Sequence, residues 1–460
     1  MTIRYSTQVI QADTLTPIAI FNSLKGKKKF ILESSSHHQD KGRYSFIGIN
    51  PFQEIIGTDQ EVTVKTDTTI EEINEKPLEF VKHEIPRIDL ELPFPFYGGA
   101  IGYMSYDLIR NYQRIGPLLP DEIKMPDLHL LIYQDVLIFD HQKQTLTIIA
   151  LDLSGTRDKL ALDKAIEVIV GQLKEHQTEL ENEGLTLQFK PSIDQSTFIK
   201  LVEEAQQYIE RGEVLQVVLS QRMTARFVDD PFQLYRRLRV MNPSPYMYYI
   251  DFSDYQIIGT SPESLLKVKG KKVITNPIAG TRPRGKTKAE DQRLAEELLA
   301  DRKELLEHEM LINLSRSDLE QVCHTETIHL TKHMLIERYQ HVMHIISELT
   351  GELKDNLTSI DALLGLLPAG TVSGAPKQRA MQIINQLESV RRGVYAGAVG
   401  YININGDLDL AIAIRTMVIK DQIAYVQAGA GIVAESDPRR EYEETLNKAK
   451  SLVEAANKIT

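Results

Sequence analysis

Two stretches of alternating apolar and polar residues, each interrupted by a short polar turn, constrain the fold most strongly. In LHLLIYQDVLIFDHQKQTLTIIALDL the last two runs are joined by a polar turn at His141–Lys143. In YININGDLDLAIAIRT, Asn405 and Gly406 separate two alternating runs, the second of which we expect to end at Arg415. Both patterns are typical of β-hairpins, and Asn-Gly is a preferred hairpin turn. We therefore expect β-strands in both halves of the chain.

An acidic segment near residues 180–192 divides the chain into two regions. Residues 1–185 mix short strands and turns and end in RDKLALDKAIEVIVGQLKEHQTELENEG, which predicts an amphipathic helix running into a linker. Residues 190–455 open with DQSTFIKLVEEAQQYIERGEV, a predicted helix that stops at Gly212. The next strand, EVLQVVLSQR, carries Gln216, whose polar side chain needs hydrogen-bond partners or a cavity.

Charge and cysteine content exclude several classes of protein. The 460-residue chain has a formal net charge of −11, so it lacks the basic excess of a general nucleic-acid or anionic-membrane binder. We see no signal-peptide core and no apolar run of membrane-spanning length. The one cysteine, Cys323, lies where a predicted helix ends and is interpreted as structural. A single cysteine in the chain suits a reducing compartment. These features favour a cytoplasmic enzyme or binding protein.

Several features of the second region favour a site for an anion and a metal ion. Three segments are rich in Gly and Pro: TNPIAGTRPRG, predicted to have no regular structure, LLPAGTVSGAPKQRAMQII, and AYVQAGAGIV, whose Gly429-Ala430-Gly431 we expect to offer free N–H groups between a strand and a helix. Two predicted helices carry paired glutamates three residues apart, and such pairs could converge on Mg²⁺, although on a helix they are usually a solvated face. These pairs are Glu304 with Glu307 and Glu441 with Glu444.

The ordered motifs IIGTSPESLL, NPIAGTRPRG, EHEMLINLSRSDL, LPAGTVSGAPKQRAM, AIAIRT and AGAGIVAESDPRREYEETLNKA resemble the chorismate-utilising enzymes. They cover most of residues 190–455. The resemblance implies an α+β fold, a composite β-sandwich of two sheets with flanking helices to which both regions contribute strands. One motif departs from the family, because INLSRSDLEQV differs at Asn313, Ser315, Ser317 and Glu320. We expect these four changes to affect packing, partner contacts or loop geometry rather than the chemistry.

The resemblance also implies roles for individual residues. The family's metal-ligating glutamates fall on Glu307 and Glu444, with Glu304 and Glu441 beside them, and the metal would be Mg²⁺. The general acid falls on Glu263 and the active-site histidine on His344. The substrate-binding positions fall on Gly280, Thr281, Thr371, Tyr395, Arg415, Gly429, Ala430, Gly431 and Lys448. Chorismate is a dianion, so positive charge and oriented amides are needed to bind it to an acidic protein.

Two positions indicate the nucleophile. Some family members carry a lysine where Ala279 stands, and its amine attacks the ring; others carry a lysine where Gln216 stands, and it activates water. This chain has neither lysine. A glutamine cannot take a proton from water at neutral pH, whereas ammonia needs no such base. The pair therefore points to direct attack by ammonia, as in the anthranilate synthases of this family.

Two further segments resemble the paired segments that bind feedback-inhibiting tryptophan in anthranilate synthases. They are LESS at 32–35 and NPSPYM at 242–247. The positions carried over are Glu33, Ser34, Pro245, Tyr246 and Met247. Alone, NPSPYM could be merely a Pro-rich turn, but the occurrence of both segments in one chain favours an inhibitor site.

The hypothesis is therefore Mg²⁺-dependent conversion of chorismate and ammonia to anthranilate and pyruvate, the first step of tryptophan biosynthesis. The chain contains no glutaminase nucleophile elbow with a cysteine, so ammonia is expected from a separate glutamine amidotransferase small subunit. An aminodeoxychorismate synthase is the alternative within the family. The alternative from another class is a non-catalytic regulator that binds tryptophan or chorismate.

Overall fold

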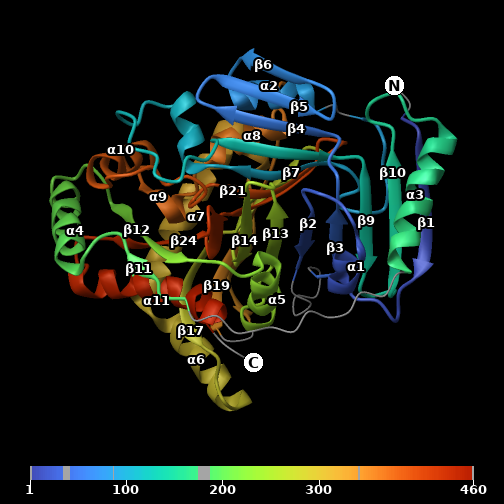
Figure 1. Cartoon of the computed structure of the whole chain (residues 1–460). Helices are drawn as coiled ribbons and strands as arrows, with labels where there is room; N and C mark the ends of the chain where they lie inside the picture. Colours follow the sequence, from blue (N-terminus) through green and yellow to red (C-terminus); the bar gives the residue numbers. More distant parts are fainter. Residues whose placement is uncertain (1–2, 35–41, 86–87, 175–186, 340–341, 458–460) are drawn as a thin grey trace.

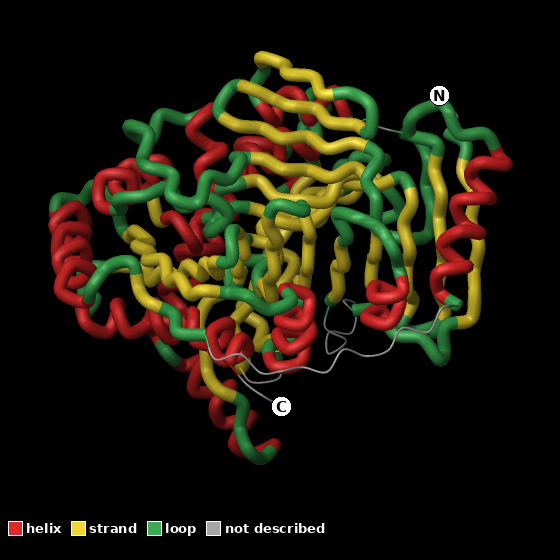
Figure 2. Tube along the Cα trace, in the orientation of Figure 1, coloured by secondary structure: helices red, strands yellow, loops and turns green. Residues whose placement is uncertain are grey.

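Two large antiparallel β-sheets form the centre of the molecule, and helices lie around them (Figure 1). The computed structural model describes the chain except residues 1–2, 35–41, 86–87, 175–186, 340–341 and 458–460. Among the described residues each sheet has 12 strands, and in Figure 2 the upper strands run across those beneath them. The predicted α+β sandwich of two sheets with flanking helices is confirmed.

Both regions of the sequence contribute strands to each sheet, where the strands of one region lie together beside those of the other. The first sheet contains, in spatial order, β1 (Tyr5–Gln11), β10 (Thr145–Leu151), β9 (Asp135–Asp140), β3 (Tyr44–Gly48), β2 (Phe30–Glu33), β13 (Tyr246–Asp251), β14 (Tyr255–Ser261), β23 (Thr416–Lys420), β24 (Ile423–Ile432), β12 (Gln216–Arg226) and β11 (Lys190–Pro191), with β20 (Gly374–Ala375) also paired to β12. The second contains β17 (Ile278–Pro283), β19 (Val342–Glu352), β16 (Lys272–Thr275), β15 (Ser264–Lys269), β22 (Leu408–Ile412), β21 (Ala398–Asn403), β7 (Gly99–Met104), β8 (Leu128–Tyr133), β4 (Gln53–Thr58), β5 (Glu61–Thr66) and β6 (Ile70–Asn74), with β18 (His329–Arg338) paired to β19.

Both predicted hairpins are present. Strands β9 and β10 pair antiparallel across the polar turn, and β21 pairs with β22 across Asn405 and Gly406. Gly406 has a φ of 90°, a conformation that glycine adopts at little cost. The predicted strand end at Arg415 was wrong, because β22 ends at Ile412 and Arg415 lies in the connection to β23.

The helices cover the outer faces of the two sheets. They are α1 (Pro17–Ser23), α2 (Pro77–Glu84), α3 (Lys159–Leu173), α4 (Gln195–Glu210), α5 (Pro231–Met241), α6 (Lys288–Ala300), α7 (Arg302–Val322), α8 (Ser359–Leu366), α9 (Gly370–Ser373), α10 (Lys377–Leu387) and α11 (Pro438–Asn457), with short 3₁₀ turns at Tyr106–Asn111 and Thr325–Thr327. Gly212 ends the α4 segment with a φ of 72°, as predicted. The predicted linker near 180–192 falls largely outside the described residues.

An apolar core fills the space between the sheets. Ile101 of β7 and Tyr133 of β8 pack in one cluster with Phe30 of β2, Ile250 of β13 and Ile257 of β14. Since the first two belong to one sheet and the others to the opposite sheet, this cluster holds the sandwich together by burying apolar surface. Among the described residues, no helix has the length and apolar content needed to cross a membrane.

Cys323 has the structural character expected of it. It caps the C-terminus of α7, is fully buried, and packs where a side chain on Gly351 would stand. Burial raises the pKa of its thiol to about 11, so the reactive thiolate is disfavoured at neutral pH.

Candidate functional site

Glu263 lies where the chain passes from one sheet to the other. Strand β14 ends at Ser261 and β15 begins at Ser264, and the two strands belong to different sheets. The backbone of Glu263 is fixed on both sides, since its carbonyl accepts from Ile412 N at 3.0 Å and its N–H donates to Ser261 Oγ at 3.4 Å. This short connection turns the carboxyl inward, where the residue is only 7% exposed.

Burial controls the protonation of this carboxyl. It raises the pKa of Glu263 from 4.5 to about 8, although the Thr371 hydroxyl and the Lys448 ammonium lower it in part. Glu263 is therefore mostly protonated at neutral pH and can donate a proton. A cavity lies beside it, lined by Glu263, Ser264, Leu265, Thr275, Asn276, Pro277, Leu311, Leu314, Ser315, Asp318, Leu366, Ala369, Gly370, Thr371 and Ile412. Ser315, which we expected to lie away from the chemistry, thus lines the cavity next to Glu263.

His344 is held by the segment that was predicted to lack regular structure. That prediction was wrong: Ile278–Pro283 forms strand β17, which pairs with β19 and has an irregular register at Gly280. Gly280 has a φ of 65°, which allows the bulge, and β17 is an edge strand whose last residue is a proline, the position where a proline is tolerated.

The ring of His344 contacts the bulge directly. Its Nδ1 lies 2.9 Å from the Gly280 carbonyl oxygen and 3.0 Å from Thr281 Oγ1. Donation to the carbonyl places the proton on Nδ1 and leaves Nε2 as an acceptor. Burial lowers the pKa of His344, and the charge of Arg415 lowers it further, so the ring is neutral at neutral pH.

The glycine-rich segment lies within a strand rather than in a turn before a helix. Gly429, Ala430 and Gly431 belong to β24 and pair with Ser220, Leu219 and Val218 of β12. The prediction of a strand-to-helix anion loop was therefore wrong. Strand β23 pairs with β24 only as far as Val426, so among the described residues the glycine segment is covered by a strand on one side only.

The two glycines make room for polar groups. A Cβ atom on Gly429 would lie 2.6 Å from the Tyr395 hydroxyl, and one on Gly431 would lie 2.5 Å from Gln216 Nε2. Glycine is thus needed here for close approach rather than for a turn. Gln216 is 5% exposed, and its Oε1 is buried with no hydrogen-bond partner among the described residues. The amide therefore has an unused acceptor beside the glycine strand.

Arg415 occupies a strained turn, close enough to His344 for its charge to act on that ring. Its φ is 50°, an uncommon value for a non-glycine residue and one often found at functional sites. Its carbonyl accepts from Thr260 N at 3.0 Å, which fixes the turn to β14. Burial lowers the pKa of the guanidinium, but its ordinary value is so high that it stays charged.

Helices α7 and α11 bring the predicted glutamates towards each other. Burial raises the pKa of Glu307, and the negative charges of Glu304 and Glu444 raise it further. The pKa of Glu441 is likewise raised, first by burial and then by Glu444. Among the described residues, no three His, Cys, Asp or Glu side chains are arranged to hold a metal ion. The repulsion between these carboxylates is nevertheless the kind that a divalent cation would relieve.

Lys448 links the glutamates to the glycine strand. Its Nζ donates to the Gly429 carbonyl at 3.1 Å and lies 2.7 Å from Glu444 Oε1. Asp437 accepts hydrogen bonds from the N–H groups of Arg439 and Arg440, so it caps α11 with Pro438 in the first turn, as expected. This cap fixes the start of the helix that carries Lys448.

The two segments predicted to bind an inhibitor lie side by side. Strands β2 and β13 pair with Met247 opposite Glu33, and Pro245 and Tyr246 directly precede Met247. The Tyr246 hydroxyl donates to Asp409 Oδ1 at 2.9 Å. The Ser34 hydroxyl is buried with no hydrogen-bond partner in the described part of the chain, and Ser35 falls outside that part.

Two residues that hold Glu33 were not foreseen. The Glu33 carboxylate accepts from the Tyr235 hydroxyl at 2.6 Å and from Arg239 Nε and Nη2 at 2.8 and 2.9 Å. Both partners lie on α5, which directly precedes the NPSPYM segment. Their closeness in sequence to that segment is the only signal that could have identified them.

Comparison with known proteins gives a consistent result over the whole chain. The family described as chorismate binding enzyme matches residues 27–454. Anthranilate synthase component 1 of Lactococcus lactis is 46% identical over 451 residues, covering 96% of this chain and 98% of the relative. The protein of the same name from Thermus thermophilus is 41% identical and covers 98% of both chains.

Solved structures agree with these similarities. The crystal structure of anthranilate synthase component I from Streptococcus pneumoniae superposes with a TM-score of 0.85 at 44% identity, covering 97% of this chain and 99% of that one. The menaquinone-specific isochorismate synthase of Escherichia coli gives a TM-score of 0.75 at 20% identity, covering 99% and 95%. This second likeness concerns the fold alone.

Proposed function

Because the chain belongs to the chorismate binding enzyme family, and within it to the group of the anthranilate synthase component 1 proteins, we propose that it converts chorismate and ammonia to anthranilate and pyruvate. The chain is an enzyme of this family. The observation that carries the proposed chemistry is the buried Glu263 carboxyl, protonated at neutral pH and lining a cavity. Residues 190–455 are proposed as the catalytic region and residues 1–185 as the region bearing the inhibitor segment, with the two intertwined.

Binding of the substrate rests on positive charge and backbone amides. Arg415 and Lys448 supply the charge that a dianion needs in a protein of net charge −11. Amides of the glycine strand of β24, on the side that β23 leaves uncovered, are proposed to face the carboxylates. The remaining proposed contacts are Gly280, Thr281, Thr371, Tyr395, Gly429, Ala430 and Gly431.

The reaction begins with ammonia adding at C2 of the ring. Ammonia arrives unprotonated, so no base is required, and Gln216 offers only an amide. As the C4 hydroxyl departs, Glu263 gives it a proton and water leaves. The added nitrogen then loses one proton, which can return to the Glu263 carboxylate. Loss of the C2 proton breaks the ring C–O bond to the enolpyruvyl group, and the neutral His344 with its Nε2 free to accept a proton assists this second elimination. The released enolpyruvate takes up a proton at its methylene carbon and becomes pyruvate. The products balance as anthranilate, pyruvate and water.

Mg²⁺ is proposed as the cofactor, held by Glu307 and Glu444 with Glu304 and Glu441 beside them. Burial raises the pKa of Glu307, and the neighbouring carboxylates of Glu304 and Glu444 raise it further, which supports this donor set. When bound, the ion supplies positive charge for the ring carboxylate. The ammonium group of Lys448 pairs with Glu444 and contacts Gly429, so it places a positive charge between the glutamates and the glycine strand.

Partners follow from the same chemistry. A glutamine amidotransferase small subunit is proposed as the source of ammonia, and tryptophan as an inhibitor bound between β2 and β13. Met247 of β13 pairs with Glu33 of β2, and Ser34, Pro245 and Tyr246 adjoin these two residues in sequence, which supports the inhibitor site. The cytoplasm is the proposed location.

The test is a fluorescence assay on the purified chain. With chorismate, Mg²⁺ and ammonium we expect anthranilate, and with glutamine in place of ammonium we expect none. Chromatography identifies the product, since a para-amino isomer would indicate an aminodeoxychorismate synthase. Calorimetric binding of chorismate without any turnover would instead indicate a regulator. Glutamine-driven product from the chain alone would refute the need for a partner subunit.

A further inference from the structure

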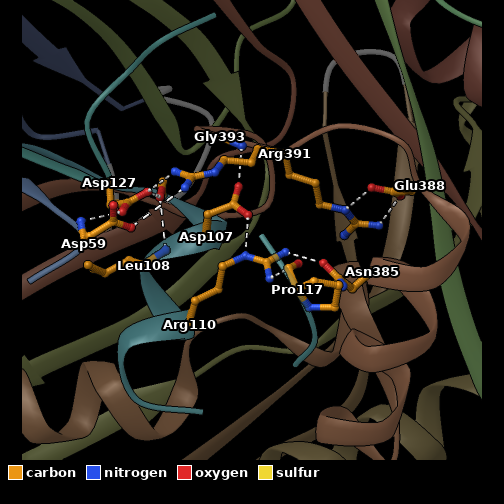
Figure 3. A network of polar contacts seen from close by, with 12 residues as sticks. Asp59, Asp107, Leu108, Arg110, Pro117, Asp127, Asn385, Glu388, Arg391 and Gly393 are labelled. Carbon is orange, nitrogen blue, oxygen red and sulfur yellow. Dashed lines mark hydrogen bonds and ion pairs between the residues drawn. The ribbon is translucent and has the colours of Figure 1, made fainter. Parts of the chain in front are cut away.

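A buried ion pair contacts β12, the strand that pairs with the glycine segment of β24. Arg392 Nε and Nη2 bond to the two carboxylate oxygens of Glu388 at 2.9 and 2.6 Å. The side chains are only 1% and 7% exposed. Figure 3 shows Glu388 with this two-pronged contact at one end of a polar network. A charge pair so deeply buried is costly unless its remaining hydrogen-bonding groups are also satisfied.

The Arg392 guanidinium also donates hydrogen bonds to two backbone carbonyls of the site. Its Nη1 donates to the Val372 carbonyl at 2.7 Å, and its Nη2 donates to the Val218 carbonyl at 2.7 Å. Val372 directly follows Thr371, and Val218 pairs with Gly431. One guanidinium therefore fixes both α9, which contains Thr371, and β12, the strand that pairs with Gly431.

Glu388 fixes the same strand at a second point. Its Oε1 accepts from both the backbone N–H and the hydroxyl of Ser220, at 2.9 and 2.8 Å, and Ser220 pairs with Gly429. In addition, the Tyr395 ring centroid lies 5.6 Å from the Arg392 guanidinium carbon, within the range of a cation–π contact. The ion pair thus touches the supports of Gly429, Gly431, Thr371 and Tyr395.

A second arginine of the network, Arg110, offers a control. Arg110 Nε bonds to Asp107 at 3.0 Å and its Nη2 bonds to Asn385 at 2.6 Å, while Asp107 also accepts from Gly393 N at 2.9 Å (Figure 3). The Arg110 and Asp107 side chains are 12% and 2% exposed, so this pair is largely, though less completely, buried. None of these contacts of Arg110 reaches the glycine strand or Thr371.

We propose that Arg392 is a positioning residue for the substrate: locked by Glu388, it holds β12 and the turn of α9 at the spacing at which the glycine strand, Thr371 and Tyr395 together bind the ligand. The identity of the ligand as chorismate rests on the proposed function. A lysine cannot replace the arginine, because one ammonium cannot form the two-pronged carboxylate contact and still reach two carbonyls in fixed directions.

The experiment compares Arg392→Lys with the control Arg110→Lys, and adds the charge-balanced double variant Arg392→Met/Glu388→Gln. For each folded variant we measure KM and kcat with ammonium, chorismate affinity by calorimetry, and the melting temperature. Losing two oriented hydrogen bonds behind the ligand is expected to raise KM and Kd for chorismate at least ~10-fold, with kcat changed less than about threefold. The control is expected to lower the melting temperature with KM and Kd within about twofold of the parent.

Two results would overturn the positioning role. One is unchanged KM and Kd in folded Arg392→Lys or in the double variant. The other is an equal rise in KM in the Arg110→Lys control, which would mean that general loosening of the network is responsible. If the parent chain binds chorismate and forms no anthranilate, the proposed function fails, yet the calorimetric comparison still decides the role of Arg392.

Discussion

Replacing Glu263 by glutamine tests the protonated carboxyl through two independent properties, stability and rate. The substitution keeps the size and the hydrogen-bonding capacity of the side chain and removes only its titration. In the folded protein the pKa of this carboxyl is about 8, against the ordinary 4.5 of an unfolded chain. The folded state therefore binds the proton more tightly than the unfolded state, and the free energy of unfolding must fall as the pH rises from 4.5 to 8.

The size of the effect follows from the shift. Each pKa unit corresponds to about 1.4 kcal/mol, so a fully ionised Glu263 costs about 5 kcal/mol of stability above pH 8. The same relation gives a cost of about 1 kcal/mol at pH 5 and about 3 kcal/mol at pH 7. The Glu263→Gln variant carries no such cost, so its stability relative to the parent should improve by about 4 kcal/mol between pH 5 and pH 9.

Urea unfolding of parent and variant at several pH values measures this difference, because the other titrating groups are common to both and cancel. Glu203→Gln on the exposed face of α4 serves as the control for the loss of one carboxylate. In the same series, kcat/KM of the parent for chorismate, measured at a fixed concentration of free ammonia, should fall about tenfold per pH unit above pH 8. The variant should be at least ~100-fold slower than the parent below pH 8, and the difference should shrink above it. A parallel pair of stability curves would refute the buried protonated carboxyl, whatever the rates.

Three other experiments test separate parts of the site. Glu307→Gln combined with Glu444→Gln should reduce anthranilate formation at least ~100-fold and raise the Mg²⁺ concentration for half-maximal rate, and a magnesium titration with unchanged rate would contradict the metal assignment. Ser34→Leu should raise the tryptophan concentration for half inhibition at least ~10-fold, because the leucine side chain fills the space around the buried hydroxyl. The rate without tryptophan should be unchanged. An inhibition curve like that of the parent would exclude this segment from the inhibitor site. Gly431→Ala places a Cβ 2.5 Å from Gln216 Nε2, so kcat/KM should fall at least ~10-fold. Adding Gln216→Gly to this variant should restore part of the lost kcat/KM. If steady-state kinetics show no restoration, the cause of the loss is not steric.

The hairpins and the helix that ends at Gly212 were predictable because their signals are local. Asn-Gly between alternating runs and a glycine after an amphipathic helix each act within a few residues. The same local reasoning failed for Gly429–Gly431, which reads as a turn and forms the interior of β24. Its glycines serve the close approach of Tyr395 and Gln216, and that crowding comes from residues distant in sequence. A short-range pattern cannot carry such information.

The prediction for the segment that forms β17 was wrong for a related reason. A segment with two prolines and two glycines is unfavourable in a central strand, yet Ile278–Pro283 lies at the edge of its sheet, where only one side needs partners. Whether a strand lies at an edge depends on the order of strands in the sheet. That order places β17 beside β19, which begins about 60 residues later in the chain. The position of Glu263 between two sheets depends on the same global arrangement.

Charge pairs at helical spacing show most clearly where sequence reasoning stops. Glu388 with Arg392 and Glu444 with Lys448 have the same spacing of four residues, which alone predicts an exposed pair of small energetic effect. The second pair is indeed half exposed, at 46% and 44%, whereas the first is 7% and 1% exposed. The difference arises because α10 ends at Leu387, so that Arg392 lies beyond the helix and turns back towards carbonyls of β12 and α9. Because it is buried, the Glu388–Arg392 pair holds β12 and α9 in place, although its spacing is that of an ordinary surface pair. Its other partners are backbone carbonyls, which every residue has, so the sequence cannot identify them.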